Sequence, residues 1–145
     1  MSFRERTAWI TLLTIVVCFG IYYGAILTGL VPGGTWASFH LGALCFGSFV
    51  LLQVGLNVAA ALINPKDART PRDERERLIH ARSHVIGYHV LLVGMAAVLI
   101  ATHIPMHGGG MLDVIINTVN FGAFVMIIAA LSVAISQIIM YRRGH

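Results

Sequence analysis

The chain has 145 residues, of which 57% are apolar and only 11% are charged, and its mean hydropathy is +0.81. An average soluble domain carries about 25% charged residues, and a soluble helical bundle needs a polar face on every helix. We therefore interpret the chain as an all-α polytopic membrane protein, a single domain (residues 1–145) of four transmembrane helices in an antiparallel bundle.

The first two predicted spans cover about residues 7–30 and 36–63. Neither Asp, Glu, Lys nor Arg occurs between Thr7 and Pro65, which leaves enough chain for two crossings of a hydrocarbon core about 30 Å thick. The turn-forming residues VPGG at 31–34 separate the two spans. Because no cleavage signal follows the first span, we interpret it as retained in the membrane rather than removed as a signal peptide.

The third predicted helix begins in the run PRDERER, residues 71–77. Thr70 has the chemistry of an N-cap, and Pro71 has that of a first helical residue. The pattern therefore predicts that this helix starts near Thr70. Spacing of i, i+4 also predicts two ion pairs within the helix: Asp73 with Arg77, and Arg72 with Glu76.

This third helix is longer than a membrane crossing requires. We expect it to be continuous to about Thr102, a length of about 50 Å, although the span itself needs only residues 83–102. Residues 64–82 are therefore predicted to form a cytoplasmic loop and a helical extension, and we call residues 71–82 the charged stalk. Its charged side chains are the predicted contacts for a partner or for lipid: Arg72, Asp73, Glu74, Arg75, Glu76, Arg77 and Arg82.

The fourth predicted span covers about residues 112–141, after a loop at 103–110. With four spans, the N-terminus, the 64–82 segment and the C-terminus share one side of the membrane. All ten Lys and Arg residues belong to that side, and the connections on the other side contain none. The positive-inside rule then places both termini in the cytoplasm, which predicts a multi-pass protein of the bacterial inner membrane.

The start of the third helix also carries a resemblance to known proteins. The run P-x-D-E-R-E-x-L-I and the continuation R-x-x-x-I-x-Y-x-V-L resemble small uncharacterised four-helix inner-membrane proteins of proteobacteria. The matching residues are Pro71, Asp73, Glu74, Arg75, Glu76, Leu78, Ile79, Arg82, Ile86, Tyr88, Val90 and Leu91. The resemblance implies a four-helix fold and an inner-membrane location, and it implies no activity.

Three histidines lie on the third helix. His80 and His84 have i, i+4 spacing, whereas His89 is nine residues from His80 and points about 180° away. We interpret His80 and His84 as headgroup-level residues that continue the basic stalk. His89 lies deeper, at the depth of Gln53 and Asn57 on the second span, and we predict a hydrogen bond between His89 and one of these amides, with a proton relay as the alternative.

Small and polar residues inside the spans are interpreted as packing groups. Cys18 and Cys45 are expected to be apolar packing residues rather than a disulfide or a metal-binding pair. Gly20 and Gly24 form a GxxxG motif, which permits close approach of two helices. On the fourth span, three amides are expected to form hydrogen bonds between helices: Asn117, Asn120 and Gln137.

A second group of histidines belongs to the opposite side: His40, His103 and His107. They share that side with Met106, Met111 and Asp113, and imidazole with thioether suits copper or zinc. Pro105 and the following glycines favour a loop of turn residues without a preformed site. We predict no bound metal and no cofactor, and these three histidines stay the metal-ligand candidates.

No catalytic motif is recognisable in the sequence. It contains no phosphate-binding glycine loop, no HExxH, no CxxCH and no convincing nucleophile–base–acid set, so we expect no enzymatic activity. The favoured function is a small scaffold or accessory protein that contacts the bilayer, a membrane or cytoplasmic protein, or a second copy through the charged stalk, and no nucleic acid. The alternative is transport or metal handling through His89 or through the group of His40, His103 and His107.

Overall fold

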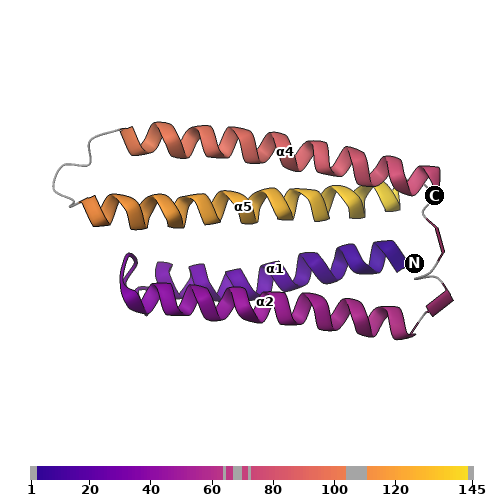
Figure 1. Ribbon diagram of the computed structural model, residues 1–145, viewed down its shortest axis with the longest axis horizontal. Helices are drawn as coiled ribbons and strands as arrows, with labels where there is room; N and C mark the ends of the chain where they lie inside the picture. Colours follow the sequence, from indigo (N-terminus) through magenta and orange to yellow (C-terminus); the bar gives the residue numbers. More distant parts are fainter. Residues whose placement is uncertain (1–2, 64, 67–69, 72, 104–110, 144–145) are drawn as a thin grey trace.

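The computed structural model describes residues 3–63, 65–66, 70–71, 73–103 and 111–143, and these residues form four long helices (Figure 1). Their bounds are Phe3–Leu27 (α1), Trp36–Ile63 (α2), Glu74–His103 (α4) and Met111–Arg142 (α5). Each helix is long and apolar enough to cross a membrane. The prediction of an all-α chain with four helices of spanning length is confirmed.

The bounds of α2 coincide with the predicted second span, whereas α1 ends at Leu27 rather than near Leu30. Gly29 follows the helix with a φ of 73°, a left-handed conformation that glycine adopts without steric cost and that stops helical propagation. Gly34 has a φ of 76° and turns the chain into α2. Thr35 and Ser38 then exchange hydrogen bonds across the first turn of α2.

The start of α4 differs from the prediction. The helix begins at Glu74, and the residue that caps it is Asp73, whose Oδ1 accepts a hydrogen bond from Glu74 N at 2.8 Å. The hydroxyl of Thr70 instead donates to the carbonyl oxygen of Lys66. Aspartate caps a helix as well as threonine does, so the helix starts at the later residue and the predicted start near Thr70 is wrong.

From Glu74, α4 continues without a break for 30 residues, a length of about 45 Å. It therefore still exceeds the hydrocarbon thickness of about 30 Å. The predicted continuity of this helix through residues 74–102 is confirmed.

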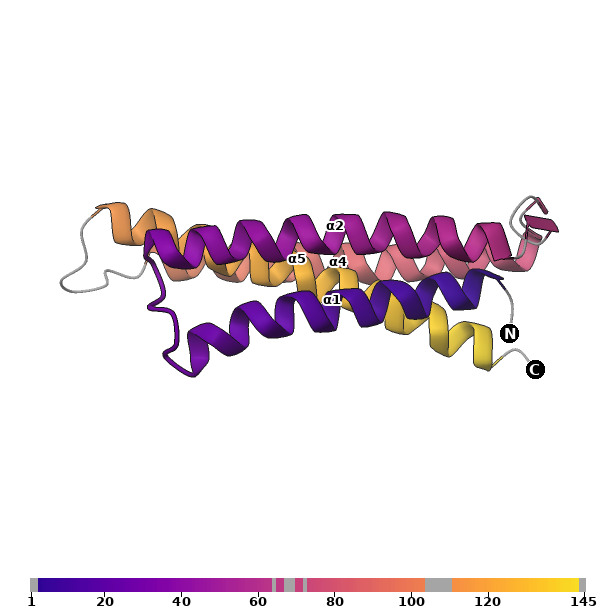
Figure 2. The ribbon, with the colours of Figure 1, turned by 90° about the horizontal axis from the view of Figure 1, so that it is seen from below.

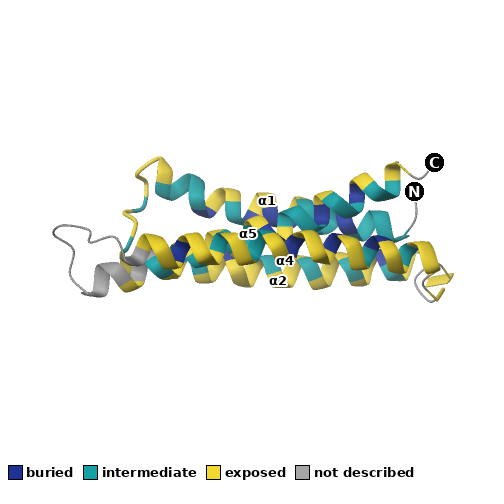
Figure 3. Ribbon diagram, turned by 90° about the horizontal axis from the view of Figure 1, so that it is seen from above, coloured by how far each residue is buried: buried dark blue, intermediate teal, exposed yellow. Residues whose placement is uncertain are grey.

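The helices pack in the order α2, α1, α5, α4, with α1 and α5 as the inner pair. Figure 1 shows that the starts of α1 and α4 and the ends of α2 and α5 lie at one end of the molecule, which we call the charged end. In Figure 2, α5 slants so that its C-terminal half comes beside α1. The buried residues lie along these contacts, and most of α2 is exposed (Figure 3).

Candidate functional site

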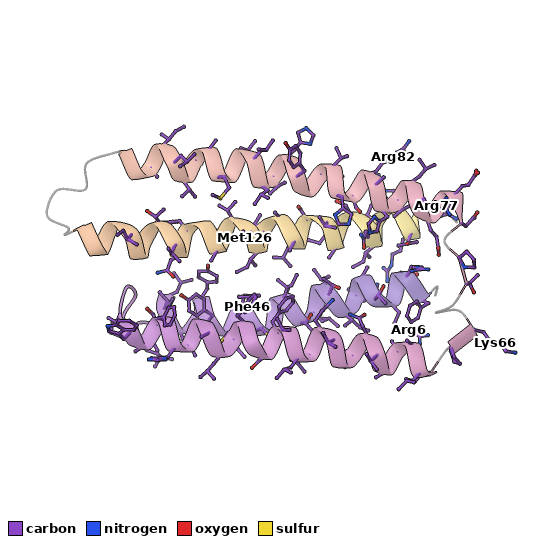
Figure 4. All side chains as sticks on the ribbon, in the orientation of Figure 1. Arg6, Phe46, Lys66, Arg77, Arg82 and Met126 are labelled. Atoms are coloured by element: carbon purple, nitrogen blue, oxygen red, sulfur yellow. The ribbon has the colours of Figure 1, made fainter. Side chains whose placement is uncertain are left out.

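The charged stalk divides its side chains between the protein and its surroundings. Glu76 turns toward α1, where its Oε2 lies 3.5 Å from Arg4 Nε. Arg75, Leu78 and Arg82 are exposed, and Figure 4 shows Arg82 extending away from the neighbouring helices. One face of the stalk thus carries an ion pair to α1, while Arg75, Leu78 and Arg82, which we call the outward face, are covered by none of the four described helices.

Of the two predicted ion pairs within the stalk, the structure tests only the one between Asp73 and Arg77, and that pair does not form. The carboxylate of Asp73 is used to cap Glu74 rather than to bind Arg77, so that pairing is wrong. Glu76 pairs with Arg4 on another helix, because α1 begins beside α4 at the charged end. Arg72 lies outside the described residues.

A second ion pair joins α1 to α5 at the same end. Arg142 Nε lies 3.7 Å from Glu5 Oε1, and the Arg142 guanidinium carbon lies 5.3 Å from the centre of the Trp9 ring, within reach of a cation–π interaction. The first turns of α1 are therefore connected to both α4 and α5.

The contact between α4 and α5 depends on small residues. Ser83 is 0% exposed; its hydroxyl donates to the carbonyl of His80 at 2.8 Å and accepts from Gln137 Nε2 at 3.1 Å. A Cβ added at Gly87 would clash with Val133, and one added at Gly94 would clash with Val125. The two glycines therefore form hollows that receive valines of α5. We call this close contact the α4–α5 seam. The sequence interpretation missed it, although Ser83 and Gly87 have the small-xxx-small spacing that could have indicated it.

The GxxxG motif of the first helix has no such role in this chain. A Cβ added at Gly20 or Gly24 would meet nothing within 4 Å. Close approach occurs on α4 instead.

His80 and His84 come together on one side of α4. Their Nε2 atoms lie 3.1 Å apart, and the ring centres are 4.2 Å apart. His84 is exposed and His80 is half-buried. The i, i+4 spacing therefore results in a converging pair, which we call the histidine pair.

His89 does not make its predicted contact. Its side chain is exposed, and its Nδ1 lies 2.7 Å from the carbonyl oxygen of Val85 on its own helix. The prediction that His89 bonds to Gln53 or Asn57 is wrong, because α4 packs on α5 through the opposite face, on which Ser83 and Gly87 lie.

The two amides of α2 find partners elsewhere. Gln53 Nε2 donates to Thr11 Oγ1 at 2.6 Å, and Gln53 Oε1 accepts from Thr14 Oγ1 at 2.8 Å. Asn57 Nδ2 donates to the carbonyl of Gln53 at 2.7 Å, while its Oδ1 is buried without a partner. Gln53 thus joins α2 to α1 rather than to α4.

The hydrogen bonds that join α2 to α1 and those that join α5 to α4 lie at the same depth along the bundle. The Arg4–Glu76 ion pair aligns α1 with α4, and both helices run away from the charged end. Thr11 and Ser83 each lie seven residues beyond that ion pair, about 10 Å along the helix axis. Hydrogen bonds between helices therefore form a layer at this depth. The turn of α4 that contributes Ser83 to this layer also carries the histidine pair.

Nearer the opposite end, a third set of polar contacts joins α1 to α5. The hydroxyl of Tyr22 donates to Asn120 Oδ1 at 3.0 Å, and that of Tyr23 donates to the Asn120 carbonyl at 3.3 Å. The expected roles of Asn120 and Gln137 in hydrogen bonds between helices are confirmed. The side chain of Asn117 lies outside the described residues.

The outer histidines are only partly described. His40 is exposed and contacts the rings of Trp36 and Phe39. His107, and the side chain of His103, lie outside the described residues, as do Met106 and the side chains of Met111 and Asp113. Within the described part of the chain, no group of three or more His, Cys, Asp or Glu residues could hold a metal ion. Cys18 and Cys45 are buried and unpaired by a disulfide.

Comparisons with protein-family models, with curated proteins and with solved structures find no match to this chain.

Proposed function

We propose that this chain is a bacterial inner-membrane scaffold or accessory protein that holds a partner protein through the outward face of α4. In this proposal the four helices form an antiparallel bundle in the membrane, and the charged end faces the cytoplasm. The observation that carries the proposal is the division of the stalk, in which Glu76 binds Arg4 while Arg75, Leu78 and Arg82 are exposed.

Orientation is supported by the distribution of basic residues. Every Lys and Arg of the sequence belongs to the charged end or to the segments that continue from it. Cytoplasmic segments of inner-membrane proteins carry such an excess, and anionic lipid on that side adds attraction for the same residues.

The chemistry of the outward face favours a protein partner with an acidic surface. Arg75 and Arg82 are two turns apart on one side of the helix, and Leu78 between them is 57% exposed. Arginines flanking an apolar side chain are typical of protein interfaces, where arginine is enriched over lysine. Because Glu76 is engaged by Arg4, its charge does not neutralise the two arginines on this face.

A crosslinking experiment in cells tests this proposal. A photoreactive amino acid at position 78 is expected to capture one discrete protein, identified by mass spectrometry. Position 62 is the matched control, because Leu62 is 76% exposed and lies at the charged end of α2. The double substitution Arg75→Glu and Arg82→Glu should abolish the crosslink. Lipid adducts alone at both positions would show that the outward face contacts only the bilayer.

The alternative is transport or metal handling through His89, which bonds to its own helix among the described residues, or through the group of His40, His103 and His107.

A further inference from the structure

We propose that His80 and His84 form a two-histidine binding site for a transition-metal dication of the Cu²⁺ or Zn²⁺ class. Their Nε2 atoms converge to 3.1 Å. At the usual metal–nitrogen distance of about 2.0–2.1 Å, this separation gives a nitrogen–metal–nitrogen angle of about 100°. Such an angle lies between the values of square-planar and tetrahedral coordination, so both imidazoles can bind one ion without movement of the helix.

The backbone that carries the histidine pair is held firmly. Ser83, between the two histidines, is fully buried, and its hydroxyl joins the carbonyl of His80 to the amide of Gln137 on α5. One turn later, Gly87 packs against Val133. These contacts fix the rotation of α4 and therefore the side of the helix on which both histidines lie, which removes part of the ordering cost of binding.

The surroundings leave coordination positions open. His84 is exposed and His80 is half-buried, so water or another ligand can complete the coordination of a bound ion. Glu76 lies one turn before His80 on the same side of α4 and is paired with Arg4. Because Arg4 balances its charge, this ion pair adds no net charge beside the histidine pair.

The same helix provides an internal control. His89 lies about 180° around the helix from His80, and its Nδ1 is engaged with the Val85 carbonyl oxygen. Like His84 it is exposed, but no second imidazole lies near it among the described residues. The structure therefore distinguishes a converging pair from a single histidine on one helix.

Copper titration of the full chain in lipid nanodiscs tests the proposal, with Cu²⁺ as the probe. Binding is followed by electron paramagnetic resonance, and pulsed measurements count the coordinated imidazoles. We expect a site with two imidazoles in the wild type and in His89→Gln. We expect His80→Gln and His84→Gln to lose one imidazole signal and to bind at least about tenfold more weakly.

The outcomes separate this site from the other histidines. Loss of the two-imidazole signal on His84→Gln, with an unchanged circular dichroism spectrum, supports the proposal, because His84 is exposed and its replacement leaves the fold intact. A two-imidazole signal that persists in both variants would place the ion at other histidines and overturn the proposal. Absence of binding in the wild type, or equal loss in His89→Gln, would overturn it as well. These results do not depend on whether position 78 crosslinks to a partner, so the metal site and the partner surface are tested separately.

Discussion

At the depth of Thr11 and Ser83, the α1–α2 seam and the α4–α5 seam bring two helices together by different means. Gln53 of α2 exchanges hydrogen bonds with Thr11 and Thr14 of α1. On the other seam, the small residues Ser83 and Gly87 let α4 approach α5 closely. The α1–α2 seam contains two hydrogen bonds from one long side chain, whereas the α4–α5 seam combines one hydrogen bond, from Gln137 to Ser83, with close packing at Gly87.

This difference has an energetic consequence in a membrane. Lipid is as apolar as leucine, so packing and hydrogen bonds, rather than the hydrophobic effect, hold helices together there. A hydrogen bond between helices contributes only about 0.6 kcal/mol on average, whereas overpacking a tight contact costs about 1–3 kcal/mol. The α4–α5 seam should therefore be the more sensitive of the two to substitution.

The largest effect is expected for Gly87→Ala. The new methyl group would clash with Val133 Cγ2 and approach the Ala129 carbonyl oxygen to 3.3 Å, so the free energy of unfolding should fall by about 1–3 kcal/mol. Equilibrium unfolding in mixed micelles measures this loss. The matched control is Gly55→Ala on α2, where the added Cβ meets nothing within 4 Å and no loss is expected.

A second substitution sharpens this prediction. Val133→Ala removes the methyl group that the new Cβ would strike, so Gly87→Ala combined with Val133→Ala should be more stable than the sum of the single changes predicts. Strict additivity would show that the hollow at Gly87 does not receive Val133.

A smaller effect is expected for Gln53→Leu on the other seam. It removes both bonds to α1, but Thr11 and Thr14 keep their hydrogen bonds to backbone carbonyls of their own helix. The expected loss of unfolding free energy is about 0.6–1.7 kcal/mol. Asn57→Leu is the control, because among the described residues Asn57 bonds only within α2 and its Oδ1 is buried without a partner; this change should cost nothing. Equal losses for the two variants would contradict the assigned role of Gln53.

The smallest effect is expected for Arg4→Gln, which breaks the ion pair between α1 and α4. Partly exposed ion pairs contribute about 0–1 kcal/mol, and the loss should shrink at high salt concentration because screening already weakens the pair. The exchanged pair, Arg4→Glu with Glu76→Arg, should regain stability lost in either single variant. If the exchanged pair is no better than the single variants, Arg4 and Glu76 do not interact.

The four helices could be predicted from the long stretches without charge, because a spanning helix needs about 20 apolar residues and little else. Their rotation could not be predicted in the same way, since lipid accepts apolar side chains on every face. The interpretation of His89 shows this limit: matching depths placed it level with Gln53, but depth does not say which way a side chain points. Only the spacing of Ser83 and Gly87 could have indicated which face of the third helix packs. The metal-ligand role of His40, His103 and His107 stays a prediction.

The proposed partner surface requires that the charged end faces the cytoplasm, since a cytoplasmic partner can reach Leu78 only in that orientation. Paired topology reporters test it most directly. A reporter that is active only in the periplasm should be silent when fused after Arg143 and active when inserted at Thr35, and a reporter that is active only in the cytoplasm should show the reverse. Periplasmic activity after Arg143 would invert the topology and contradict both the orientation and the proposed partner surface.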